Sequence, residues 1–86
     1  MFEVILAPEA RAFYATADGP LARKLARCFA QLEQDPHRHN NIKRLTGALA
    51  GRIRYRVGDW RVIYRVDDRA QRVHVLSIAH RSEVYE

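Results

Sequence analysis

The segment from residue 52 to residue 66 constrains the fold of this chain more than any other feature. It reads RIRYRV, then Gly58 and Asp59, then WRVIYRV, so two alternating stretches flank a two-residue turn. Because successive side chains of a strand point to opposite faces, a turn of this length also sets the register. We therefore predict an antiparallel hairpin with the cross-strand pairs Val57 with Trp60, Tyr55 with Val62, and Ile53 with Tyr64.

This register divides the hairpin into an apolar face, which should pack on helices, and a charged face. The apolar face holds Ile53, Tyr55, Val57, Trp60, Val62 and Tyr64. The opposite face, called the arginine face below, holds Arg52, Arg54, Arg56, Arg61 and Arg65, with Ile63 as its apolar member. A charged sheet face is usually only a solvated one. Here Arg56 lies opposite Arg61, and like charges across a hairpin repel, so the pattern favours an anionic partner, either a polyanion or an acidic protein segment.

The rest of the chain predicts an α+β fold. Residues 2–6 form an apolar strand, and helices over about 8–15 and 20–34 are separated by Asp18, Gly19 and Pro20. Residues 35–41 lack an apolar period and predict a loop, while residues 72–79 predict a third strand after the hairpin. We expect an N-terminal strand, a helical hairpin and a three-stranded antiparallel meander whose small sheet packs on the helices, all in one domain of residues 1–86.

Charge and composition narrow the classes of function. The chain has 86 residues, 48% of them hydrophobic, which suffices for one modest core. The net charge is +5, and it is concentrated in residues 44–86, where nine Lys or Arg face five Asp or Glu. Such a balance fits nucleic-acid binding or ordinary solubilising charge. Since the sequence has no long apolar run and no signal-peptide pattern, we expect a cytoplasmic protein without membrane contact.

Residues that often signal a cofactor or a catalytic thiol give no such pattern here. Cys28 lies among apolar residues and predicts a small buried side chain. His37 and His39 have no accompanying Cys or second acidic cluster, which favours a surface loop over a metal site. Gly47 and Gly51 lack the context of a phosphate-binding fingerprint. We expect no metal and no cofactor.

Three residues after the third strand could join the arginine face through a short helix or turn. His80, Arg81 and Tyr85 are of types that suit phosphoester chemistry on RNA, where the ribose 2′-hydroxyl is a nucleophile supplied by the substrate. His80 is either a proton carrier or a structural histidine. Tyr85 either contacts a base or phosphate or is a core aromatic residue. Lys43 and Arg44 either extend the basic surface or keep their segment hydrated.

The residues of the second half resemble the RelE/ParE toxin superfamily. The resemblance lies in IKRLTGALAGRIRYRVGDWRVIYRV, followed by AHRSEVY. In the first of these two segments, the residues that match the superfamily are Lys43, Leu45, Gly47, Gly51, Arg52, Arg54, Gly58, Trp60, Arg61 and Tyr64. The predicted order of strand, two helices and three strands also matches, so the resemblance extends over nearly the whole chain.

This resemblance implies a toxin of a type II toxin-antitoxin system. RelE toxins are ribosome-dependent endoribonucleases (mRNA interferases) that cleave mRNA in the decoding site by attack of the 2′-hydroxyl, and a cognate antitoxin silences them. The implied partners are thus the 70S ribosome, mRNA and an antitoxin in a hetero-oligomer. Two alternatives stay open: a ParE-like inhibitor of DNA gyrase without nuclease activity, and an inactive or merely RNA-binding relative.

Individual roles follow from the same resemblance. Arg52 and Arg54 stand where RelE carries catalytic lysines, Arg61 where it has a phosphate-stabilising arginine, and Arg81 and Tyr85 resemble its C-terminal catalytic pair. Apart from the resemblance, the basic side chains of Lys43, Arg44, Arg56 and Arg65 predict further RNA contacts. Arginine is a much poorer proton acceptor than lysine. The role of base must therefore pass to another group, for which His80 is our hypothesis.

Overall fold

The computed structural model describes residues 1–84 and contains two helices, five strands and two short 3₁₀ turns. In chain order they are β1 (Glu3–Leu6), α1 (Pro8–Thr16), α2 (Gly19–Gln34), β2 (Ile42–Arg44), η1 (Gly47–Leu49), β3 (Ile53–Val57), β4 (Trp60–Asp67), β5 (Arg72–His80) and η2 (Arg81–Glu83). The sheet has the order β1-β5-β4-β3-β2, with β1 parallel to β5 and the other pairs antiparallel. The α+β prediction is confirmed, and β2 is a strand that the sequence did not reveal.

Both helices begin where the sequence indicates. Pro8 occupies the first turn of α1, where its missing N–H costs nothing. Before α2, the Asp18 carboxylate accepts a hydrogen bond from the Leu21 backbone N–H at 2.9 Å, so Asp18 caps the helix. The apolar stripe of α2 then buries Leu25, Cys28 and Leu32. The helical hairpin is therefore confirmed.

The hairpin of β3 and β4 has the predicted register. Val57 pairs with Trp60, Tyr55 with Val62, and Ile53 with Tyr64, across a turn in which Gly58 adopts φ +60°. The apolar face of the hairpin joins Ala10 of α1 and the stripe of α2 in one hydrophobic cluster. The predicted core is thus confirmed, and the arginine face is the side of the sheet turned away from it.

Strand β5 contains an irregularity that explains its imperfect alternation. Ile63 pairs with Ser77 but Tyr64 pairs with Val75, so Leu76 has no partner in β4. A bulge of this kind shifts the alternation by one residue. As a result Val73 and Val75 before the bulge and Ile78 after it all point into the core.

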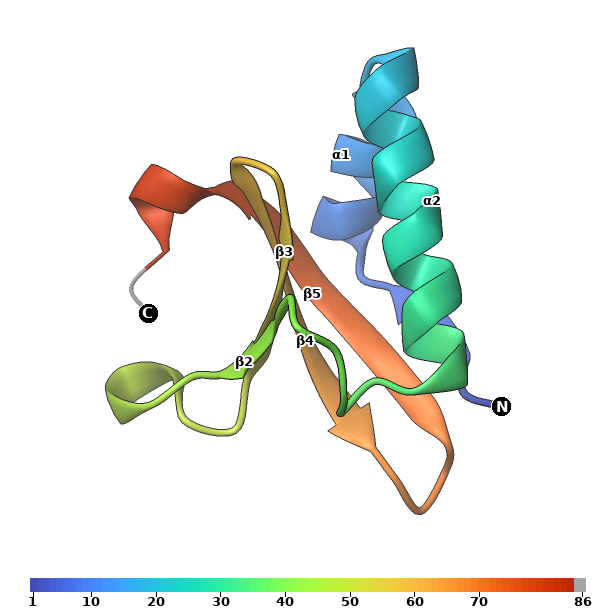
Figure 1. Cartoon of the computed structure of the whole chain (residues 1–86), viewed down its shortest axis with the longest axis vertical. Coiled ribbons are helices and arrows are strands. Elements are labelled where there is room, and N and C mark those ends of the chain that lie inside the picture. Colours follow the sequence, from blue (N-terminus) through green and yellow to red (C-terminus); the bar gives the residue numbers. More distant parts are fainter. Residues whose placement is uncertain (85–86) are drawn as a thin grey trace.

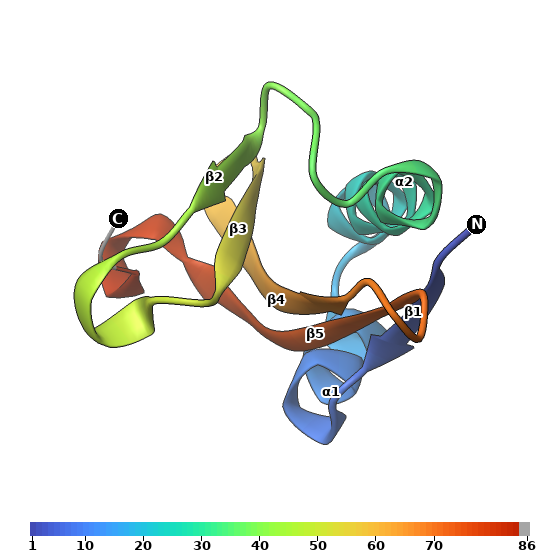
Figure 2. The same ribbon diagram turned by 90° about the horizontal axis from the view of Figure 1, so that it is seen from below.

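The two sides of the sheet carry different elements. In Figures 1 and 2, α2 lies on one side of the sheet, whereas η1 and the red η2 project from the other. Strand β2 extends the sheet beyond β3, with Lys43 opposite Arg54 and Arg44 opposite Ile53. No helix within residues 1–84 is long and apolar enough to cross a membrane. The side that carries η1 and η2 is the arginine face.

Candidate functional site

Strand pairing arranges the side chains of the arginine face in rows across the sheet. One row contains Arg56, Arg61 and Ala79, and the next contains Lys43, Arg54, Ile63 and Ser77. Arg52 directly precedes β3, and Arg65 lies farther along β4, opposite His74. The structure therefore brings together the predicted residues Lys43, Arg52, Arg54, Arg56 and Arg61, with Arg65 at the far end of the same face.

The centre of this face is a hollow rather than a continuous layer of arginines. A cavity of about 420 Å³ lies over Ile63, Ser77 and Ala79. Leu49 of η1 and Val84 after η2 contribute apolar walls to it. The hollow forms because β5 presents the small residues Ser77 and Ala79 where β3 and β4 present arginines.

Two arginines beside the cavity are held by backbone carbonyl groups. Arg61 donates from Nη1 to the carbonyl oxygens of Gly58 and Trp60 at 3.0 and 3.1 Å. Arg54 donates from Nη1 to the Asn41 carbonyl at 2.6 Å. Such contacts restrict the guanidinium groups before any ligand binds, which lowers the entropy cost of binding an anion. Both side chains are partly buried, whereas Arg56 is exposed.

The turn η2 attaches the end of β5 to the tip of the β3–β4 hairpin. The Arg81 backbone N–H donates to the Asp59 carbonyl at 2.8 Å, and Arg81 Nε lies 3.7 Å from the Asp59 carboxylate. Because Arg61 contacts Gly58 of the same turn, Arg81 and Arg61 converge there. The structure therefore places Arg81 at the tip of the hairpin that carries the arginine face, and its catalytic role stays a prediction. Tyr85, also predicted for this site, lies outside the described residues.

His80 belongs to the other side of β5. It lies opposite Trp60 in the sheet, and the two rings meet edge to face with centroids 5.4 Å apart. Its Nδ1 accepts a hydrogen bond from the Ser82 backbone N–H at 3.3 Å, which caps η2. Since Trp60 packs on the core, the structure does not bring the His80 ring to the cavity, and its role as a proton carrier stays a prediction.

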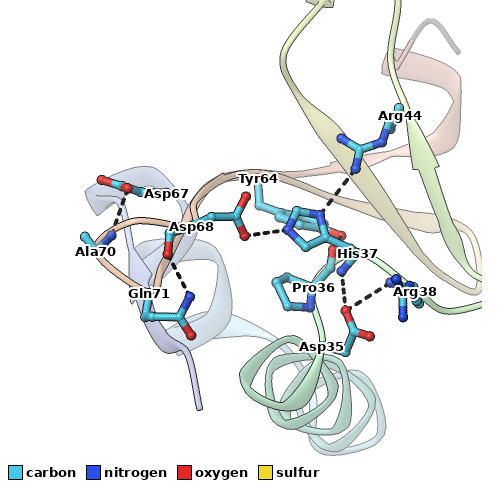
Figure 3. Close-up of polar contacts among 10 residues, drawn as sticks. All are labelled: Asp35, Pro36, His37, Arg38, Arg44, Tyr64, Asp67, Asp68, Ala70 and Gln71. Atoms are coloured by element: carbon cyan, nitrogen blue, oxygen red, sulfur yellow. Dashed lines mark hydrogen bonds and ion pairs between the residues drawn. The ribbon is translucent and has the colours of Figure 1, made fainter.

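Arg44 is also separated from the arginine face, because adjacent residues of a strand point to opposite sides. Its Nη2 donates to His37 Nδ1 at 3.3 Å, and His37 Nε2 in turn donates to Asp68 Oδ1 at 2.7 Å (Figure 3). This chain of contacts ties the loop after α2 to the β4–β5 turn. The Tyr64 hydroxyl also donates to the Pro36 carbonyl of the same loop at 2.7 Å. The group fixes the position of the loop and of β2.

Burial raises the pKa of three side chains, all on the helix-facing side. Desolvation raises the pKa of Cys28 to about 12 and also raises the pKa values of Tyr55 and Tyr64. A thiol with so high a pKa is a poor nucleophile at neutral pH, in keeping with the structural role expected for Cys28. Within residues 1–84 no three His, Cys, Asp or Glu side chains cluster as metal ligands.

Sequence reasoning did not single out Leu49, Ser77 or Glu83, which line the cavity. Leu49 and Ser77 carry no chemical signal of their own. Glu83 does lie within the SEVY segment that contributed to the family resemblance. Its position over the arginine face depends on η2, which the sequence indicated as a short helix or turn without showing its path.

Comparisons with known proteins agree on one family. The protein-family model of the ParE toxin of type II toxin-antitoxin systems (parDE) matches residues 4–85. Toxin RelE of Mycobacterium tuberculosis is 42% identical over 57 residues, which are 66% of this chain and 57% of that protein. This chain thus matches little more than half of that relative. Toxin RelG of the same organism is 35% identical over 65 residues, 76% of this chain and 72% of RelG.

Solved structures show the same fold. The toxin-antitoxin complex RelBE2 of Mycobacterium tuberculosis contains a chain that superposes with a TM-score of 0.78 and 28% identity, covering 92% of this chain and 96% of that one. A chain of the archaeal RelE–RelB complex of Pyrococcus horikoshii gives a TM-score of 0.82 at 22% identity, covering 96% and 98%. At that identity the likeness concerns the fold alone.

Proposed function

Because this chain belongs to the ParE toxin family of type II toxin-antitoxin systems, within the RelE/ParE superfamily, we propose that it is a ribosome-dependent endoribonuclease. In this proposal residues 1–86 form a single domain that cleaves mRNA in the decoding site of the 70S ribosome and thereby inhibits translation. The protein then acts in the cytoplasm, where ribosomes translate.

The observation that carries the proposal is the set of arginines around the cavity. Arg54 and Arg61 are held by backbone carbonyls, and Arg52 lines the cavity itself. Guanidinium groups fixed in this way offer paired donors to a phosphate group. The arginine face also carries a cost of like-charge repulsion, since Arg56 and Arg61 are direct cross-strand partners. A phosphodiester bound over the cavity would offset that repulsion.

The chemistry that fits this face is attack of the ribose 2′-hydroxyl on the adjacent phosphorus. The 5′-oxygen of the next nucleotide then leaves, and the product is a 2′,3′-cyclic phosphate. Arg61, with Arg52 and Arg54, would stabilise the charge that builds on the phosphate oxygens. The ribosome would hold the mRNA in line for attack, and this positioning can supply a large part of the rate.

The test is cleavage of end-labelled mRNA in a purified stalled ribosome complex. We expect a new end in the decoding-site codon with the wild-type protein, and a rate at least about 100-fold lower with Arg61→Ala, the size of loss seen when one charge-stabilising donor is removed. Arg69→Ala is the matched control, because Arg69 is an exposed residue of the β4–β5 turn. Equal rates for Arg61→Ala and wild type would contradict the proposal.

A second candidate function is inhibition of DNA gyrase, favoured by the matching family model being that of a ParE toxin. A supercoiling assay with purified gyrase, run beside the ribosome assay, separates the two. Intact mRNA together with inhibited supercoiling would assign the protein to the gyrase-directed class. If the protein neither cleaves mRNA nor inhibits supercoiling, it is an inactive relative.

The proposal includes a cognate antitoxin, since the structural relatives named above are toxin-antitoxin complexes. An acidic or amphipathic segment of the antitoxin would cover the arginine face and so exclude RNA. We expect antitoxin and a short RNA to compete for the toxin in a fluorescence anisotropy titration. Simultaneous tight binding of both would contradict a shared surface.

A further inference from the structure

The arginine face has cations for a phosphate, but arginine does not remove a proton from a ribose hydroxyl at neutral pH. Arg52 and Arg54 stand at the positions where the resemblance to RelE toxins implies catalytic lysines. The sequence offers His80 as a substitute base, but its ring packs against Trp60 on the helix-facing side. The proton acceptor must therefore be sought among the groups that line the cavity.

Glu83 meets this requirement. Among the described residues that line the cavity it is the one with a carboxylate, and Arg52 is the one with a cationic side chain. The remaining walls and floor are apolar or hydroxyl-bearing, such as Leu49, Ile63 and Ser77. An ionised carboxylate accepts protons and, with two oxygens, can orient a hydroxyl group as it does so. Glu83 and Arg52 thus place a proton acceptor and a phosphate ligand in the same hollow.

The backbone holds Glu83 in this position through both ends of η2. At its start, the Arg81 N–H donates to the Asp59 carbonyl, which fixes the turn against the tip of the hairpin. His80 Nδ1 accepts from the Ser82 N–H, and the Val84 N–H donates to the Arg81 carbonyl at 3.4 Å. His80 is therefore a positioning residue for the segment that carries Glu83.

We infer that Glu83 is the catalytic residue that accepts the 2′-hydroxyl proton, an inference that rests on the proposed function. The 2′-O–H bond breaks and its proton passes to the Glu83 carboxylate, while the 2′-oxygen forms a bond to phosphorus. The bond from phosphorus to the 5′-oxygen breaks, and that oxygen takes a proton from water. Glu83 returns its proton to solvent, so the step is balanced and needs no oxidant or other co-reactant.

The experiment is single-turnover cleavage in stalled ribosome complexes, with co-sedimentation to measure ribosome binding. Glu83→Gln keeps the size and hydrogen-bonding reach of the side chain but removes the base, so we expect a rate 10²–10⁴-fold lower, the usual contribution of a general base. Ribosome binding should stay within about threefold, because one exposed side chain changes and the arginines do not. Glu9→Gln, on exposed Glu9 of α1, is the matched control and should cleave like wild type.

His80→Asn tests the alternative base. Asparagine is a good capping residue, so it can still accept from the Ser82 N–H, but it carries no imidazole. We expect His80→Asn to cleave within about threefold of wild type, whereas His80→Ala, which removes the cap, should be slower. A loss in His80→Asn with full activity in Glu83→Gln would overturn the inference in favour of histidine.

The outcomes separate this inference from the proposed function. If the wild-type protein does not cleave, the proposed function itself fails. If the wild type cleaves and Glu83→Gln cleaves at the same rate, only the assignment of Glu83 fails. If Glu83→Gln is unstable, formate is added to the cleavage reaction of Glu83→Ala as a replacement carboxylate. A partial return of cleavage supports Glu83 as the proton acceptor, and no return overturns that role.

Discussion

The replacement of Tyr64 by phenylalanine tests how the loop after α2 is held to the sheet. The Tyr64 side chain is fully buried, and its hydroxyl donates to the carbonyl of Pro36, which is also fully buried, at 2.7 Å. Burial raises the pKa of Tyr64, so the hydroxyl keeps its proton and remains a donor. Phenylalanine fills the same space but leaves the carbonyl without this donor. We expect a loss of about 1–3 kcal/mol in the free energy of unfolding.

Tyr55→Phe is the matched control, because Tyr55 lies on the same face of the same hairpin. Its hydroxyl is 3.5 Å from His39 Nε2, a long contact in a partly buried place, so its loss should cost less than about 0.5 kcal/mol. In thermal unfolding, a change of 1 kcal/mol moves Tm by about 4–8 °C for a domain of this size. A Tyr64→Phe protein as stable as wild type, or as stable as Tyr55→Phe, would refute the assigned hydrogen bond.

Three further changes test the fold and the face. Arg56→Glu should stabilise the protein by a few tenths of a kcal/mol in urea unfolding, because it replaces the like-charge pair with Arg61 by a pair of opposite charges. The same change should slow cleavage on the ribosome. A lower free energy of unfolding would contradict the pairing. Asp18→Ala removes the acceptor for the Leu21 N–H and should cost about 1 kcal/mol, measured the same way; an unchanged midpoint would argue against the cap. Cys28 should resist thiol reagents at pH 8 in the folded protein and react on unfolding, since burial raises its pKa to about 12; rapid labelling of the native state would show that it is accessible.

The hairpin could be predicted in detail because two independent constraints act on it. The two-residue turn at Gly58 and Asp59 fixes which residues pair, and the alternation fixes which face is buried. A shift by one residue would have buried Arg54 and Arg61 and exposed Tyr55. Registers with that cost are excluded by burial energies alone, so the sequence determines the register without knowledge of the rest of the chain.

Strand β2 escaped prediction because it is too short to show a period. Its three residues, IKR, contain one apolar side chain, and the strand exists through its pairing with β3. Without that assignment Lys43 and Arg44 looked alike as candidates for RNA contact. Once they lie in one strand they must point to opposite sides, and only Lys43 shares a side with the arginine face.

The position of η2 shows why the residues that line the cavity could not be predicted from their neighbours in the sequence. His80 ends β5 on the helix-facing side, and three residues later the chain has turned over the arginine face. The sequence places His80 next to the last strand, but it does not show that the His80 ring packs against Trp60 while Glu83 lines the cavity. The path of the turn depends on the contact between Arg81 and Asp59, two residues far apart in the sequence, which no local pattern reveals.

The bulge at Leu76 links the core and the cavity through a single irregularity. If β5 alternated regularly through residue 76, either Val73 and Val75 or Ile78 would leave the core, at a cost of about 1.5–3 kcal/mol for each side chain exposed. With the bulge all three stay buried, and Ser77 becomes the small residue opposite Ile63 on the arginine face. The hollow over Ile63 is thus a consequence of how β5 satisfies the core. A site at this place therefore lies over the pairing of β4 with β5, inside the sheet rather than at its edge.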